Sequence, residues 1–379
     1  RREFINKSII AAAGLAIGAR ALNDLFLANP AKLFQFGREP GNEEFIKEAY
    51  YYQNRGSAVQ CLLCPKECTL SNNTRSICRA RYNKDGILYT LAYANPCSMH
   101  VDPIEKKPLY HYMPTTTSFS IATGGCNFTC LNCQNWEISQ SNPDELETIE
   151  VKPEAVVEAA QRANCKTIAY TYSEPSIFYE YMLDTSRLAA EQGIKNLWIT
   201  NGYLNEKPFR EFSKYLGAAN VDLKGFDDNF YIKVCSGTRD PVLNTLKILK
   251  EQKNWFEVTH LMIPTLNEDM DKLREMAKWI YKNLGTDYPL HFSRFSPAYK
   301  LTHLPATPVK LLEAGRKIAV EEGIKYVYIG NVPGHEAQNT YCPNCGKIVV
   351  KREGYAVGLT NLNNSACVNC GESIAGIWS

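Results

Sequence analysis

GGCNFTCLNCQNW, residues 124–136, places Cys126, Cys130 and Cys133 in a C-x3-C-x2-C arrangement. Thiolates at these spacings can bind three irons of a [4Fe-4S] cluster, whereas bacterial ferredoxins add a nearby cysteine that is followed by proline. Here the next cysteine is the distant Cys165, which no proline follows. One iron would then stay open to a substrate or cofactor, which suits catalysis better than electron transfer. A zinc site or three buried thiols are the alternatives, although structural zinc sites have four protein ligands.

The composition is that of an ordinary globular protein. The chain has 379 residues, of which 45% are hydrophobic and 22% are charged, so it is long enough for two or three domains. Its net charge is +2 and no lysine- or arginine-rich run occurs, so we expect no nucleic-acid partner. Eleven of its fourteen cysteines fall into three clusters of four, three and four. Gaps of two and three residues within clusters are typical of metal sites rather than of a disulfide framework.

The first 23 residues resemble a twin-arginine export signal. Arg1 and Arg2 precede a run of twelve small or apolar residues, from Ser8 to Ala19, whereas a membrane-spanning helix needs about 20. We therefore interpret residues 1–23 as a signal segment outside the fold, and expect no membrane span and a periplasmic or membrane-associated location. An amphipathic helix or a truncated start, with a cytoplasmic location, is the alternative.

A second cysteine cluster lies in residues 24–114, which we interpret as a cysteine-rich N-terminal region. Two, three and nine residues separate its successive members. Four cysteines could close a tetrahedral zinc site or hold a second iron–sulfur cluster, and ordinary buried thiols are the alternative. The four residues are Cys61, Cys64, Cys68 and Cys78.

From residue 115 to 335, short apolar runs alternate with stretches of helical periodicity. The predicted helices are 153–162, 176–192 and 269–283, which are bounded by proline at the first start and glycine after the other two. The alternation predicts an α/β fold with a parallel sheet and crossover helices, either a barrel or an open doubly wound sheet. The seven predicted strands are 118–122, 167–171, 196–200, 220–223, 256–262, 289–292 and 326–329.

Polar residues follow three consecutive predicted strands. Glu174 comes after the second strand, Thr200 and Asn201 end the third, and Asp222 and Lys224 end the fourth. The cysteine triplet directly follows the first strand, and ligands of parallel barrels bind at the carboxyl ends of the strands. A turn or a helix cap would explain each residue alone. Their succession behind the triplet favours a cofactor site.

These features together resemble the radical S-adenosylmethionine (SAM) enzymes. The resemblance implies a partial (β/α)6 barrel and a [4Fe-4S] cluster whose open iron chelates SAM. An electron from the cluster then cleaves SAM to a 5′-deoxyadenosyl radical, which abstracts hydrogen from a protein or small-molecule substrate. The resemblance also implies a low-potential donor of the flavodoxin or ferredoxin type. Its implied SAM-binding residues are Glu174, Thr200, Asn201, Asp222 and Lys224.

Longer motifs resemble a narrower group, the AmmeMemoRadiSam-system radical SAM enzymes, which are relatives of pyruvate formate-lyase activating enzyme. One departure is Asn132, because the residue before the third cysteine is often aromatic in the superfamily. A glycyl-radical-enzyme activase and a multi-cluster electron-transfer protein without SAM chemistry are the alternative functions. The matching segments are DPIEKKPLYH (102–111), CQNWEISQ (133–140), EPSIFYE (174–180) and GNVPGHE (330–336).

Two residues near the ends of the last two predicted strands are candidate catalytic groups. Arg294 could hold an anionic group, and His335 lies in a Gly-His-Glu turn. Both are also common as core or loop residues, so spacing alone does not assign them a role.

Residues 336–379 contain two C-x2-C-G knuckles, which indicate a tetrahedral metal site with four thiolates. The pattern is that of a zinc ribbon or rubredoxin-like site, and it does not distinguish zinc from iron. Two disulfides are the alternative for an exported chain. Because the knuckles closely follow His335, we expect the ribbon to lie beside the mouth of the active site. The four cysteines are Cys342, Cys345, Cys367 and Cys370.

Overall fold

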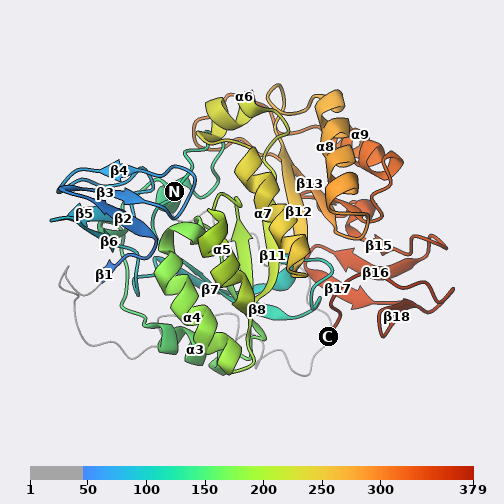
Figure 1. Ribbon diagram of the computed structural model, residues 1–379. Coiled ribbons are helices and arrows are strands. Elements are labelled where there is room, and N and C mark those ends of the chain that lie inside the picture. Colours follow the sequence, from blue (N-terminus) through green and yellow to red (C-terminus); the bar gives the residue numbers. More distant parts are fainter. Residues whose placement is uncertain (1–45) are drawn as a thin grey trace, which may run out of the picture. The chain divides into compact units, whose positions relative to one another are not determined.

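The structure is a computed structural model that describes residues 46–379 (Figure 1). The predicted signal segment, residues 1–23, lies outside the described residues, so its export role stays a prediction. Within the described part of the chain, no helix is both long enough and apolar enough to cross a membrane.

An eight-stranded sheet is the central element. Seven neighbouring strands, β8 to β14, are parallel and lie in chain order, and β7 pairs antiparallel with β8 at one edge. The seven predicted strands are confirmed, whereas the doubly wound alternative is wrong because the strand order never reverses. The resemblance implied six parallel strands, which is one fewer than the seven observed. The bounds are β7 Ser98–Pro103, β8 Thr117–Ala122, β9 Thr167–Tyr170, β10 Lys195–Thr200, β11 Leu216–Asp222, β12 Trp255–Met262, β13 Leu290–Arg294 and β14 Val327–Gly330.

A helix of seven or more residues connects each pair of consecutive parallel strands, and the shorter helices α2 Trp136–Ser139 and α6 Asp228–Phe230 precede two of them (Figure 1). The helix predicted over 153–162 has those bounds, and the one predicted over 269–283 begins one residue later. The stretch predicted as one helix over 176–192 instead starts with a 3-10 turn, Pro175–Phe178, before the α-helix begins. The connecting helices are α3 Pro153–Arg162, α4 Tyr179–Glu191, α5 Glu206–Phe212, α7 Asp240–Glu251, α8 Met270–Asn283 and α9 Val309–Glu321.

The segment between β7 and β8 covers part of the sheet. Leu109 and Tyr112 pack in one cluster with Ala169, Leu197 and Ala218, which belong to β9, β10 and β11. Trp198, which directly follows Leu197 in β10, stacks on Phe209 of α5. Because successive side chains of a strand point to opposite faces, the sheet is buried on both sides. This burial explains why its strands read as nearly continuous apolar runs.

Two small antiparallel sheets precede the central sheet, with strand orders β1-β6-β5 and β2-β3-β4. Arg81 of β5 makes a bidentate ion pair with Glu180 of α4, with N–O distances of 2.8 and 2.9 Å. Both side chains are fully buried, so losing either partner would leave an uncompensated charge. The strands are β1 Lys47–Glu48, β2 Tyr52–Arg55, β3 Ala58–Cys61, β4 Thr69–Leu70, β5 Arg81–Lys84 and β6 Ile87–Thr90.

The C-terminal strands pack at the amino ends of the central strands. Cys342 and Cys367 share a buried cluster with Tyr326, which directly precedes β14. The ring of His111 lies against Tyr326 and Trp378. The expectation that the ribbon borders the site at the carboxyl ends is therefore wrong, because the chain runs back along β14 before the first knuckle. The strands are β15 Thr340–Tyr341, β16 Ile348–Glu353, β17 Ala356–Leu359, β18 Leu362–Asn363 and β19 Ala366–Cys367.

His111 gives this packing a defined pH dependence. Its Nδ1 donates to the carbonyl of Ala375 at 2.6 Å, and its Nε2 accepts from the hydroxyl of Tyr328. Burial lowers the pKa of His111 from 6.5 to about 4, because the charged ring would lose its hydration. Between these values the unfolded chain binds a proton that the folded chain does not, so acidification destabilises the fold.

We predict that His111→Phe unfolds more easily than the wild type at pH 7, because it lacks both hydrogen bonds. The difference in free energy of unfolding between the two proteins should narrow by up to about 3 kcal/mol between pH 6.5 and pH 4, since the variant has no imidazole to protonate there. Denaturant unfolding of both proteins across this range measures the gap. A gap that stays constant or widens on acidification would contradict the buried, neutral state of His111.

Candidate functional site

The loop with the cysteine triplet follows the carboxyl end of β8. Gly125 has φ +102°, and a Cβ atom there would lie 2.5 Å from the carbonyl oxygen of Cys78. Glycine is therefore needed for both the backbone conformation and the close approach. Farther along, the backbone N–H groups of Thr129 and Leu131 donate to the carbonyls of Cys235 and Val234, at 3.2 and 3.0 Å. The loop is thus fixed by neighbouring segments rather than by a regular element of its own.

The three thiols of the triplet are in different environments. Burial raises the pKa of Cys126 and of Cys133, because a buried thiolate loses its hydration. A hydrogen bond with the thiol of Cys235 lowers the pKa of Cys130. The sequence analysis did not assign Cys235, because it lies about a hundred residues from the triplet. Its place beside Cys130 follows from the loop contacts.

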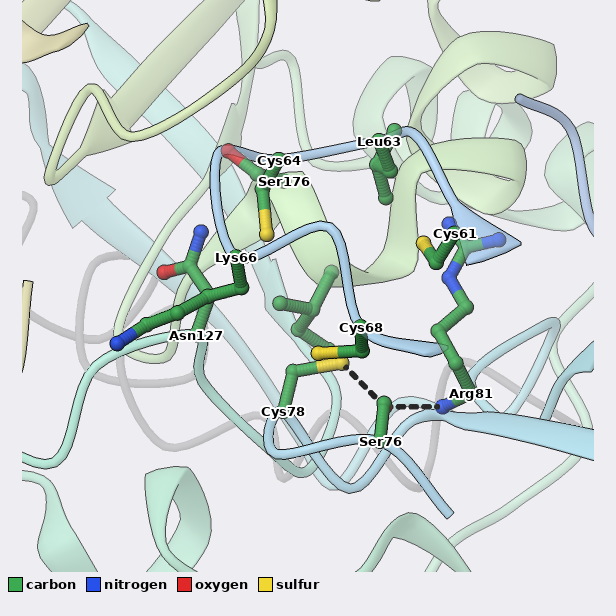
Figure 2. A pocket seen from close by; sticks show the side chains of 11 residues that line it. Cys61, Leu63, Cys64, Lys66, Cys68, Ser76, Cys78, Arg81, Asn127 and Ser176 are labelled. Atoms are coloured by element: carbon green, nitrogen blue, oxygen red, sulfur yellow. Dashed lines mark hydrogen bonds between the residues drawn. The ribbon is translucent and has the colours of Figure 1, made fainter. Parts of the chain in front are cut away.

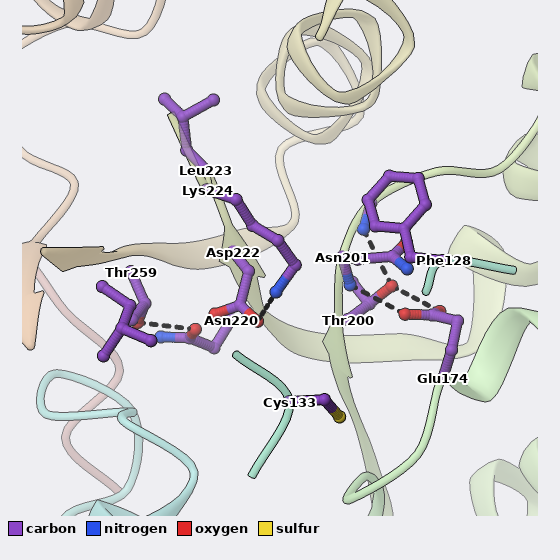
Figure 3. A network of polar contacts seen from close by, with 12 residues as sticks. Phe128, Cys133, Glu174, Thr200, Asn201, Asn220, Asp222, Leu223, Lys224 and Thr259 are labelled. Atoms are coloured by element: carbon purple, nitrogen blue, oxygen red, sulfur yellow. Dashed lines mark hydrogen bonds and ion pairs between the residues drawn. The ribbon is translucent and has the colours of Figure 1, made fainter. Parts of the chain in front are cut away.

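The carboxylate of Glu174 connects the ends of two neighbouring strands, β9 and β10 (Figure 3). Its Oε1 accepts from the backbone N–H and the hydroxyl of Ser176, and from the hydroxyl of Thr200 at 2.7 Å. Its Oε2 accepts from the backbone N–H of Asn201 at 2.8 Å. Burial of this carboxylate, which is 3% exposed, raises the pKa of Glu174, and its four donors oppose that shift.

Asn201 extends this network to the triplet. Its side-chain NH2 donates to the Oδ1 of Asn127 at 2.8 Å and lies 3.9 Å from the sulfur of Cys126. Asn127 in turn donates to the carbonyl of Tyr203 at 2.8 Å. Of the predicted SAM-binding residues, Asn201 therefore contacts the triplet at Cys126, and Glu174 and Thr200 are connected to it through hydrogen bonds. Asn127 was missed by the sequence analysis, although it directly follows that cysteine.

Asp222 and Lys224 influence the second cysteine of the triplet through their charges. The Nζ of Lys224 lies 2.8 Å from the carboxylate of Asp222. Burial lowers the pKa of Lys224, but the charges of Asp222 and of the thiolates of Cys130 and Cys235 outweigh it and raise that pKa overall. A protonated lysine beside Cys130 favours the thiolate form that binds iron.

The side chains of the two candidate catalytic residues make their hydrogen bonds with segments other than the triplet loop. The Nε of Arg294 donates to the carbonyl of Thr307 at 2.9 Å. The Nε2 of His335 is 3.3 Å from the carboxylate of Glu313 on α9, and its Nδ1 accepts from the N–H of Ala337. His335 thus contacts a helix on the outside of the sheet. The catalytic roles of both residues stay predictions.

Two aromatic residues meet beside the triplet loop. Trp136, shortly after the last cysteine, stacks on Tyr299 with a ring-centroid distance of 5.2 Å. The neighbouring Lys300 donates its backbone N–H to the carbonyl of Leu131 at 3.0 Å. The loop after β13 therefore borders the triplet loop, and Trp136 is another residue that spacing alone did not reveal.

The four C-terminal cysteines converge on one point. Their sulfurs all lie within 4.8 Å of one another, with separations of 3.5 Å for Cys342–Cys370 and 3.7 Å for Cys345–Cys367. A tetrahedral ion with bonds of about 2.3 Å separates its sulfurs by about 3.8 Å, which fits this set. All four cysteines are free thiols, so the disulfide alternative is wrong.

The four N-terminal cysteines line a single cavity (Figure 2). Lys66 and Arg81 contribute to its wall, as do Asn127 and Ser176 from the network around the triplet. The predicted N-terminal cluster is therefore a neighbour of the triplet. The cysteines concerned are Cys61, Cys64, Cys68 and Cys78.

The sequence matches a family model and is similar to several known proteins. Residues 120–280 match the model of the radical SAM superfamily. The uncharacterized protein MJ0808 of Methanocaldococcus jannaschii is 48% identical over 332 residues, which cover 87% of this chain and 99% of that protein. A putative glycyl-radical enzyme activating enzyme of the same organism, MJ1632, is 21% identical over 45% of this chain and 66% of its own length. Streptococcus suis SuiB bound to SAM aligns over 63% of this chain and 56% of SuiB, with 10% identity and a TM-score of 0.45.

We predict that the C-terminal site binds one zinc or iron ion without sulfide, because its sulfurs are spaced for a single ion. Replacing its two exposed ligands, Cys345→Ser with Cys370→Ser, should remove about one equivalent of metal and lower the melting temperature, since a bound ion stabilises a small cysteine-rich fold. Elemental analysis and thermal unfolding measure both effects. Cys165→Ser, a buried cysteine outside the clusters, is the control. Unchanged metal content in the double variant would refute the site.

Proposed function

This chain belongs to the radical SAM superfamily and is a radical SAM enzyme, and we propose that Cys126, Cys130 and Cys133 hold its [4Fe-4S] cluster. The observation that carries this assignment is the contact of the triplet with polar groups at the ends of β9 and β10, through Asn201 and Asn127. When bound, the cluster supplies the electron that cleaves SAM to methionine and a 5′-deoxyadenosyl radical. We further propose that the sheet curves as the partial barrel of this superfamily.

The residues around the triplet have polar atoms that suit SAM. Thr123, Asn132 and Ser173 each have a buried side-chain oxygen that makes no hydrogen bond to any described residue. They directly precede the Gly-Gly-Cys motif, the third cysteine and Glu174, respectively. Buried polar groups without partners are costly, and the amino, hydroxyl and adenine groups of SAM could satisfy them. Asn132 in place of an aromatic residue would then bind by hydrogen bonding rather than by stacking.

Glu174 is best assigned as a positioning residue. All four of its hydrogen bonds are with donors of the chain itself, and they fix the backbone on either side of the proposed SAM site. Asp222 and Lys224 contribute at the other end of the triplet, where the lysine stabilises the thiolate of Cys130. The electron would come from a low-potential donor of the flavodoxin or ferredoxin class.

The radical would abstract hydrogen from a protein or a small molecule. A glycyl-radical-enzyme activase is a second candidate, favoured by the Asp222-x-Lys224 segment and by the similarity to MJ1632. A glycyl radical on a protein substrate gives a distinct electron paramagnetic resonance signal. Its appearance after incubation with such a protein, SAM and reductant would support this candidate over small-molecule modification.

We predict that SAM cleavage depends on the triplet. After anaerobic reconstitution, the wild type should form 5′-deoxyadenosine from SAM and dithionite, whereas Cys130→Ala should form none, because its cluster lacks one thiolate. Chromatography of the products measures the reaction. Wild-type rates in Cys130→Ala would refute the assignment.

Cys235→Ser is the matched comparison, because Cys235 lies beside Cys130. We expect this variant to keep its cluster and its SAM cleavage, since the proposed function requires only three thiolates. If it instead lost the cluster as Cys130→Ala does, Cys235 would be a fourth ligand. The electron-transfer alternative would then be favoured.

We predict that Glu174→Gln weakens SAM binding by about tenfold or more, and leaves the absorption of the cluster intact. The amide keeps only one acceptor oxygen, so at least one buried donor loses its partner at a cost of about 1.5–3 kcal/mol. Equilibrium binding of SAM to the reconstituted protein gives the affinity, and Glu191→Gln on the exposed end of α4 is the control. Loss of the cluster before any loss of affinity would show that Glu174 supports the triplet rather than the SAM site.

A further inference from the structure

The N-terminal cavity gathers its cysteines from three places in the sequence. Cys61 ends β3, Cys64 and Cys68 lie in the loop before β4, and Cys78 lies in the loop before β5. Cys61 and Cys78 are only 6% and 8% exposed. Figure 2 shows the side chains of all four around the same space.

The spacing of these sulfurs differs from that of the C-terminal site. Within residues 46–379, the C-terminal set is the one group of three or more candidate ligands whose atoms all lie within 4.8 Å of one another. The N-terminal cysteines share a cavity without meeting this single-ion condition, as is also the case for the triplet. A cluster fits such a set, because each thiolate binds a different iron and the sulfurs stay farther apart.

An unpartnered buried N–H beside the cavity, on the Arg81 that pairs with Glu180, also favours a cluster over four plain thiols. Arg81 is 1% exposed, and its Nε has no hydrogen-bond partner among the described residues. Lys66 lies in the wall as well, with its Nζ donating to the carbonyl of Ser236 and pointing away from the cysteines in Figure 2. Neutral thiols are weak acceptors for the Nε–H of Arg81, whereas the negatively charged sulfurs of a thiolate-bound cluster accept it readily.

The cavity adjoins the triplet. Asn127 and Ser176 line it, and these residues hydrogen-bond to Asn201 and Glu174 on their other side. The carbonyl of Cys78 is packed against Gly125, the residue before Cys126. One layer of residues therefore separates the two groups of cysteines.

We propose that Cys61, Cys64, Cys68 and Cys78 bind a second iron–sulfur cluster, which relays electrons to the cluster of the triplet. One electron from a low-potential donor reduces the second cluster. That cluster is reoxidised when it passes the electron to the first one, so no atoms are exchanged. The relay rests on the proposed function, whereas the presence of the cluster does not.

Acid-labile sulfide in the reconstituted full chain tests the site. A single ion held by thiolates contributes no sulfide, so the C-terminal site does not interfere. A variant with Ser at Cys126, Cys130 and Cys133 should retain between about a third and a half of the wild-type sulfide, for a [2Fe-2S] or a [4Fe-4S] cluster respectively. Cys61→Ser with Cys64→Ser should retain the complementary fraction, and Cys165→Ser all of it.

The site is refuted if the triplet variant contains no acid-labile sulfide, whatever its metal content. This arm leaves the N-terminal cysteines unchanged, so a folding defect of the N-terminal variant cannot hide the result. Sulfide of no more than about four per chain in the wild type would also refute a second cluster beside a [4Fe-4S] cluster. If the triplet variant keeps its sulfide but the wild type never cleaves SAM, the proposed function fails and the second site stands.

The relay is tested by comparing two reductants. With reduced flavodoxin, Cys61→Ser/Cys64→Ser should form 5′-deoxyadenosine about tenfold more slowly than the wild type, or slower still. With dithionite, a small reductant that needs no relay, the same variant should stay within about twofold. Equal effects on both rates, including no effect on either, would refute the relay.

Discussion

A buried carboxylate that accepts four hydrogen bonds fixes the ends of β9 and β10, and the geometry of the site depends on it. Strand ends leave backbone N–H groups without partners, and a buried one must find an acceptor within the protein. Glu174 supplies that acceptor to Asn201, whose side chain is then held against Asn127 and Cys126. These contacts connect the ends of two strands to Asn127, which directly follows the first cysteine of the triplet.

The two cysteine-rich ends of the described chain have different relations to the sheet. The N-terminal cysteines adjoin the triplet at the carboxyl ends of the strands, whereas the C-terminal set packs with Tyr326 at the amino ends. The distances between sulfurs also differ between the two sets. Among the described residues, only the C-terminal cysteines are close enough together to bind one ion. A metal at the amino ends would stabilise the fold far from the triplet, and the proposed second cluster would lie beside the triplet, where an electron is needed.

The sequence predicted the features that depend on local pattern. Strands buried on both faces appear as apolar runs, proline and glycine bound the helices, and cysteine spacing identifies the triplet and the C-terminal knuckles. Contacts between distant segments were not predictable in this way. The pair Arg81–Glu180 and the contact of Cys235 with Cys130 join residues about a hundred positions apart. The position of the ribbon was predicted wrongly, because it is set by packing on Tyr326 and Tyr328 rather than by its closeness to His335 in the chain.

The tail has a consequence for the order in which the protein is made. The N–H of Ile377 donates to the carbonyl of His111, and the N–H of Met113 donates to the carbonyl of Ile377, at 2.7 and 2.6 Å. These partners leave the ribosome about 260 residues apart, which at about 5–20 residues per second is a delay of roughly 13–50 seconds. The segment that lies across β9, β10 and β11 therefore lacks these two hydrogen bonds until Ile377 has been synthesised. Closure at the amino ends of these strands thus comes after every strand of the central sheet has been synthesised.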